Sequence, residues 1–217
     1  MSCAICEKRK EKRFCPAVHG RICPQCCGEQ REVTLDCPSE CVYLRQARQH
    51  EKPRLAAELD QEALFPKVEI GDAFIYEQEQ LILGLSYSLA RSARAGASIR
   101  DRDLIAALTA LVKSYETLAN SGLHYDAPLT NLAHHSIAAD VQQMVKEYRE
   151  AEQKHTGYTR LRDSDVLRAL VFLLRMGLTR TSGRPRSRAF VDFLLAQFPE
   201  RESTIAAPNE ASRIIVP

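Results

Sequence analysis

The positions of the cysteines constrain this chain more than any other feature, because all eight lie between Cys3 and Cys41. The rest of the 217-residue chain contains none. Thiols that are this dense and that occur in close pairs are typical of metal sites, and zinc is the usual ion in structural sites made of cysteine. The segment therefore predicts a zinc-binding module, although it names no function for that module.

The two halves of the cysteine segment repeat one order of metal ligands. Each half has a close cysteine pair, followed by a second pair that begins with Cys-Pro. The four pairs, in chain order, are Cys3 and Cys6, Cys15 and His19, Cys23 and Cys26, and Cys37 and Cys41. Four pairs of ligands satisfy two tetrahedral zinc ions.

The spacing of the pairs permits an interleaved arrangement of two zinc sites. The ligands of the first ion would then be Cys3, Cys6, Cys23 and Cys26. The second ion would be bound by Cys15, Cys37, Cys41 and a fourth ligand, for which two candidates remain open. His19 preserves the repeat, whereas Cys27 would give two all-cysteine sites and leave no spare thiol.

With His19 as a ligand, the ligand order and the Cys3-Ala4-Ile5-Cys6 opening resemble RING and B-box cross-braced zinc fingers. The resemblance covers residues 1–41 and nothing beyond them. It implies a small cross-braced fold around two zinc ions. The resemblance alone would also imply a ubiquitin-ligase-like enzyme, which ranks third among the functions considered.

Both zinc ions are expected to be structural, because a zinc ion surrounded by cysteines has no open coordination position for a substrate. The first 45 residues also contain few large apolar side chains, the main ones being Phe14, Ile22, Val33 and Leu35. Such a segment cannot fold on hydrophobic burial alone. Metal binding, at about 10–16 kcal/mol per structural zinc, would supply the difference.

The rest of the chain has the apolar periodicity of helices, with no convincing strand alternation. The predicted fold class is mainly α: a small N-terminal double-zinc module followed by an antiparallel helical bundle. We expect the zinc module at residues 1–45, a connecting helix and linker at 46–71, the bundle at 72–199 and a mobile tail at 200–217. The predicted helix starts or caps after the linker are Asp72, Asp101 or Asp103, Thr130, Asp163 and Ser187.

One loop of the predicted bundle, immediately before the last helix, has the ingredients of an anion site. Arginine side chains and free N–H groups at a helix N-terminus both bind anions. The candidate residues are Arg180, Arg184, Arg186, Ser187 and Arg188.

Composition leaves the class of partner open. The formal net charge is +2, which neither requires nor excludes a polyanion. No apolar run approaches the length of a membrane span, so no membrane association is expected. Mixed charges and cysteines at the N-terminus do not fit a signal peptide, and paired cysteines suit a reducing compartment, so a cytoplasmic protein is expected.

The leading functional hypothesis is a non-enzymatic protein that acts as a protein-interaction or adaptor module. No phosphate-binding loop or dinucleotide fingerprint points to an enzyme. The alternative is a zinc-stabilised nucleic-acid-binding protein. Its phosphate contacts would come from the 180–188 loop and from Lys8, Arg9, Lys10, Lys12 and Arg13.

Overall fold

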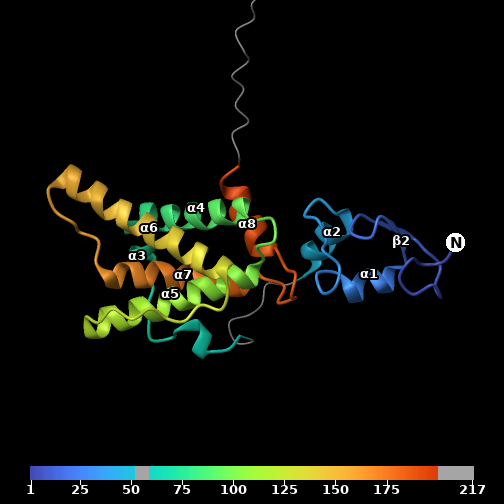
Figure 1. The fold of residues 1–217 in the computed structure, drawn as a ribbon, viewed down its shortest axis with the longest axis horizontal. Coiled ribbons are helices and arrows are strands. Elements are labelled where there is room, and N and C mark those ends of the chain that lie inside the picture. The colour runs from blue at the N-terminus through green and yellow to red at the C-terminus, as the bar shows by residue number, and fades with distance from the viewer. Residues whose placement is uncertain (52–58, 200–217) are drawn as a thin grey trace, which may run out of the picture.

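The computed structural model describes residues 1–51 and 59–199, and it places an N-terminal module at one end of a helical bundle (Figure 1). The mainly α fold class is confirmed, because the described strands form only one two-stranded sheet. Residues 52–58, within the predicted connecting segment, lie outside the described residues. So does the predicted tail at 200–217.

The module, residues 1–50, is built from a short hairpin and two helices. Its elements are β1 (Arg13–Cys15), β2 (Gly20–Ile22), α1 (Pro24–Gln30) and α2 (Val42–His50). The strands are antiparallel, with Arg13 opposite Ile22 and Cys15 opposite Gly20. Helix α1 begins at Pro24, a residue that suits the first helical position, and the Cys23 sulfur accepts a hydrogen bond from the N–H of Cys26.

Cysteines make up most of the core of the module. Three large aliphatic side chains of the module are also buried: Ile22 and Leu35 lie in the cysteine cluster, and Leu44 lies on α2. Phe14 and Val33, which also belong to the main apolar residues of the segment, are instead exposed. The apolar burial available to the module is therefore smaller than the sequence suggests, and the need for metal is correspondingly greater.

The bundle is built from four long helices and three shorter ones. They are η2 (Glu62–Leu64, a 3-10 helix), α3 (Asp72–Glu77), α4 (Glu79–Ala95), α5 (Asp101–Ser121), α6 (Leu132–Thr156), α7 (Asp163–Arg180) and α8 (Ala189–Gln197). The helix expected from Asp72 is divided at Gln78 into α3 and α4. Asn131, rather than Thr130, caps α6, because its side chain accepts a hydrogen bond from the N–H of His134.

Helices α5 and α6 run in the same direction, because the segment 122–131 returns along α5 before α6 begins (Figure 1). Midway through that return, the N–H of Ala127 donates to Ser114 Oγ at 3.1 Å. At its end, His134 Nε2 lies 3.2 Å from Asp103 Oδ1, at the N-terminus of α5. Helix α7 then packs mainly on α5 and also contacts α4.

The bundle has a core of its own that includes no cysteine. Among its fully buried side chains are Leu85, Leu89, Leu108, Leu170 and Leu174. Each such burial contributes about 1.5–3 kcal/mol. The bundle is therefore expected to fold without metal. No helix in the described part of the chain combines the length and apolar character needed to cross a membrane.

Replacing Gly177 with alanine is expected to destabilise the bundle by about 1–2 kcal/mol in thermal denaturation. A Cβ atom at this position of α7 would lie 3.0 Å from the Phe190 ring and 3.3 Å from Ile105. That overlap outweighs the gain in helix propensity, which is about 1 kcal/mol. Gly84→Ala is the matched control: its new Cβ meets only the flexible end of Met144, so stability should be unchanged or higher. Equal effects of the two substitutions would contradict the packing argument.

Candidate metal centre

The structure brings together the first predicted ligand set. The thiols of Cys3, Cys6, Cys23 and Cys26 all lie within 4.8 Å of one another. Four sulfurs bound to one zinc at about 2.3 Å would be separated by about 3.8 Å, so the cluster needs little adjustment to hold an ion. These four cysteines are consistent with one metal site.

Backbone N–H groups point at the sulfurs of this first site, as is common around zinc-bound thiolates. The N–H of Cys23 donates to Cys3 Sγ at 3.2 Å, and the N–H of Cys26 donates to Cys23 Sγ at 3.4 Å. The Arg9 guanidinium lies 3.8 Å from the sulfurs of both Cys23 and Cys26. Donors and a positive charge at these places stabilise thiolate anions, which are the form of cysteine that binds metal.

Cys3 and Cys26 of the first site differ in their affinity for protons. Burial alone would raise the pKa of Cys3, but hydrogen bonds from backbone N–H groups, chiefly those of Cys6 and Cys23, lower the pKa to about 6. Burial raises the pKa of Cys26 to about 12, with a further contribution from the neighbouring thiols. A cation bound among these thiols would stabilise them all as thiolates, because it replaces their protons and offsets the repulsion between the negative sulfurs.

The remaining four cysteines share a second small cavity, located between the hairpin, α1 and α2. Its volume is about 10 Å³, the size of a single small atom or ion. The cysteines that line it are Cys15, Cys27, Cys37 and Cys41. Their sulfurs are less tightly gathered than those of the first site, which is the one group within the described ranges whose ligand atoms all lie within 4.8 Å of one another.

His19 and Cys27, the two candidates for the last ligand position, have different environments. Cys27 is buried and lines the second cavity. His19 is exposed in the turn between β1 and β2, where it adopts a left-handed backbone conformation with φ of 48°. It is not among the residues that line the cavity.

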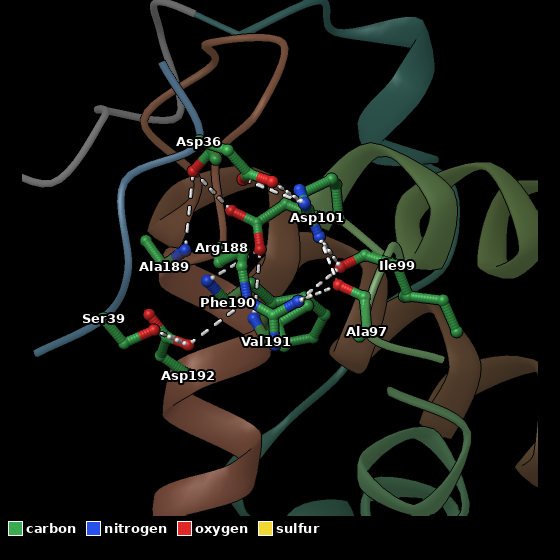
Figure 2. Close-up of polar contacts among 12 residues, drawn as sticks. Asp36, Ser39, Ala97, Ile99, Asp101, Arg188, Ala189, Phe190, Val191 and Asp192 are labelled. Carbon is green, nitrogen blue, oxygen red and sulfur yellow. Dashed lines mark hydrogen bonds and ion pairs between the residues drawn. The ribbon is translucent and has the colours of Figure 1, made fainter. Parts of the chain in front are cut away.

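Most of the predicted anion loop is engaged in contacts within the chain. Arg184 Nη1 donates to the backbone carbonyls of Gly28 and Arg31 in the module, at 3.1 and 2.6 Å. Arg188 Nη1 donates to the carbonyls of Ala97 and Ile99, at 3.2 and 2.9 Å, between α4 and α5 (Figure 2). These guanidinium groups connect parts of the fold.

The other three residues of the anion loop also face protein atoms, at least in part. The Arg180 guanidinium lies over the Phe193 ring, 3.6 Å from its centroid. Ser187 is fully buried and donates to Asp101 Oδ2 at 2.6 Å. Arg186 has an exposed side chain, whereas its backbone N–H donates to a carbonyl of the module. Anion binding by this loop stays a prediction.

An open groove on the module was not predicted from the sequence. It has a volume of about 500 Å³ and is lined by Phe14, Pro16, Glu40, Cys41, Val42, Tyr43 and Gln46. Phe14 and Val42 are 55% and 59% exposed, which is unusual for large apolar side chains placed together. The only sequence signal is indirect: apolar residues stand next to Cys15 and Cys41, two of the predicted metal ligands.

A comparison of the chain with protein-family models, with curated proteins and with solved structures found no match. The resemblance to RING and B-box fingers therefore rests only on the ligand order with His19 and on the Cys3-Ala4-Ile5-Cys6 opening.

Proposed function

We propose that the chain is a non-enzymatic zinc protein that binds a protein partner through the exposed groove of its N-terminal module. The observation that supports this proposal most directly is the groove itself, where exposed Phe14 and Val42 flank two cysteine ligands. Apolar patches of this kind, on a scaffold too small to bury them, are typical of protein-interaction sites.

Two zinc ions would hold this surface in shape. The first would be bound by the clustered thiols of Cys3, Cys6, Cys23 and Cys26. The second would be bound by Cys15, Cys27, Cys37 and Cys41, which line one ion-sized cavity. Cys27 is preferred over His19 because it is buried beside the other three ligands. Four protein ligands at each ion leave no open position for a substrate, so both zinc ions would be structural.

The charges around the groove indicate the chemistry of the partner. Arg13 stacks on Tyr43, with its guanidinium carbon 4.6 Å from the ring centroid. Arg45 is exposed one helical turn from Val42 on α2, and Lys12 is exposed beside Arg13. The two segments that contribute the groove lining, 12–16 and 40–46, thus carry these three cations and one acid, Glu40. We therefore propose a protein segment with a large apolar side chain and neighbouring acidic residues.

Selection from a random peptide library tests this assignment. We expect enrichment of peptides that combine an apolar residue with acids, and we expect Phe14→Ser/Val42→Ser to weaken their binding at least tenfold. The control is Leu132→Ser, which removes an even more exposed apolar side chain from the bundle and should leave binding unchanged. Selected peptides that bind the double variant and the wild type equally would place the interaction elsewhere.

Nucleic-acid binding is the second candidate, and three exposed lysines of the module favour it. Lys8, Lys10 and Lys12 are exposed in the segment before and at the start of the hairpin, and no contact within the described residues engages their amines. Affinity for mixed-sequence RNA or DNA should then fall steeply with salt. Replacing all three by alanine should reduce the salt slope by about three. No binding at 50 mM salt, or a slope that the triple variant leaves unchanged, would exclude this candidate.

A further inference from the structure

We propose that zinc at the second site controls the docking of the module on the bundle. The inference rests on the proposed function for its metal ligands, Cys15, Cys27, Cys37 and Cys41. It goes beyond that function by assigning the second zinc a conformational role that the first zinc does not share. Its basis is where the hydrogen bonds between module and bundle start. Among the described residues, each comes from a module residue that lies between two of these ligands or on α2, which follows Cys41.

The module segment that contacts the bundle lies between ligands of the second site. Gly28 and Arg31 accept hydrogen bonds from Arg184 through their carbonyl oxygens. Farther along, both carboxylate oxygens of Asp36 accept hydrogen bonds from Arg100 Nη2, at 2.9 and 2.8 Å. Cys27 precedes this segment and Cys37 follows it. A metal bound to both cysteines would close the segment into a loop of fixed shape.

Glu32 is the centre of the docking contact. Its side chain is 2% exposed and accepts hydrogen bonds from Ser182 Oγ at 3.0 Å and from Arg48 Nη2 at 2.8 Å. Its carbonyl oxygen accepts from the N–H of Arg186 at 2.8 Å. Glu32 also has a φ of 56°, a left-handed conformation that costs a non-glycine residue about 1–3 kcal/mol. The surrounding structure must therefore hold this residue in place.

The far end of the docking surface also depends on a second-site ligand. Ser39 lies between Cys37 and Cys41 and donates to Asp192 Oδ1 of α8 at 2.8 Å (Figure 2). Arg48, on the helix that begins directly after Cys41, donates to Asp192 Oδ2 at 2.7 Å. Figure 2 shows Ser39 of the module in contact with Asp192 of the bundle.

The first site has no such connection to the bundle. Within the described ranges, no hydrogen bond or ion pair joins residues 1–26 to residues 59–199. Loss of the first zinc should therefore disorder the hairpin end of the module and leave the docking segment in place. Loss of the second zinc should release Glu32 and its neighbours, so that the module separates from an intact bundle.

Hydrogen–deuterium exchange of the full-length chain tests this difference at one amide. The N–H of Arg186 is protected by a module carbonyl, so its exchange reports docking. We expect Cys37→Ser/Cys41→Ser, which removes two second-site ligands, to speed that exchange at least tenfold. Amides inside α5 and α7 should remain protected. The matched variant Cys3→Ser/Cys6→Ser should speed exchange in the hairpin and leave the Arg186 amide protected.

Two further measurements separate the possible outcomes. Arg184→Ala should expose the Arg186 amide with both zinc ions still bound, which shows that this amide reports docking. Zinc content of each variant is measured in parallel. Suppose that the wild type binds two zinc ions. If protection of the Arg186 amide is then unchanged in Cys37→Ser/Cys41→Ser, or is lost equally in Cys3→Ser/Cys6→Ser, the second zinc does not control docking, although the second site itself stands. Fewer than two zinc ions in the wild type would overturn both this inference and the second site.

Discussion

Removing zinc with a strong chelator is expected to unfold residues 1–50 while the bundle stays folded. Besides its cysteines, the module buries only three large aliphatic side chains, Ile22, Leu35 and Leu44, so little apolar burial remains when the metal leaves. A structural zinc contributes about 10–16 kcal/mol, more than a segment of this size gains from packing. Amide exchange in the hairpin and in α1 should approach the rate of an unfolded chain.

Re-addition of zinc is the control for this experiment. It should restore protection of the module in full, because all eight cysteines are free thiols and no disulfide has to be re-formed. Helices α5 and α7 supply the internal reference, since their exchange should not change. A module that keeps its protected amides in the chelator would show that the cysteines stabilise the fold without metal.

Replacing Asp101 with alanine is expected to destabilise the bundle by about 3 kcal/mol and to lower Tm by about 6–12 °C. Asp101 is 1% exposed, and its Oδ1 accepts from the N–H groups of Phe190 and Val191, at 3.1 and 3.0 Å (Figure 2). Its Oδ2 accepts from Ser187 Oγ. A residue of α5 therefore caps the N-terminus of α8, and alanine would leave two buried N–H groups without a partner.

Two milder variants make the capping argument specific. Asp101→Asn keeps one carbonyl oxygen for the two N–H groups of α8, so it should cost less than Asp101→Ala. Ser187→Ala removes a hydroxyl that bonds to Asp101 and also accepts from the N–H of Ser182 at 3.2 Å. We expect a loss of about 1–2 kcal/mol for that change. If Asp101→Ala lowers the stability of the bundle no more than Ser187→Ala does, the cap of α8 contributes little to that stability.

The first metal site could be predicted from the sequence because its geometry is largely local. Two residues between cysteines bring both thiols to one side of a turn, and this holds for Cys3 with Cys6 and for Cys23 with Cys26. The choice between His19 and Cys27 depends on three-dimensional structure. Cys26 and Cys27 are consecutive in α1, so their side chains project about 100° apart, and each can serve a different ion.

The helices of the bundle were also predictable, because apolar residues at helical spacing mark their buried faces. Gly122, which ends α5 with a φ of 70°, is the kind of stop signal that a sequence displays. The return of residues 122–131 along α5 was not predictable, because it depends on contacts of Ala127 and His134 with distant parts of α5.

The arginine-rich loop shows the limit of reading charges from a sequence. A cluster of arginines before a helix indicates an anion site when the partners are unknown. In the structure, Arg184 and Arg188 bind backbone carbonyl oxygens, which no sequence pattern reveals. Glu32 and Arg48 were missed for the same reason: their role depends on residues more than a hundred positions away.

The zinc content of the purified chain and of two variants tests the central claim most directly. Elemental analysis should find two zinc ions per chain in the wild type, two in His19→Ala and one in Cys27→Ser. This result would establish two sites and identify Cys27 as the last ligand. A wild-type chain with one zinc ion, or a second ion that is lost in His19→Ala and kept in Cys27→Ser, would contradict the account.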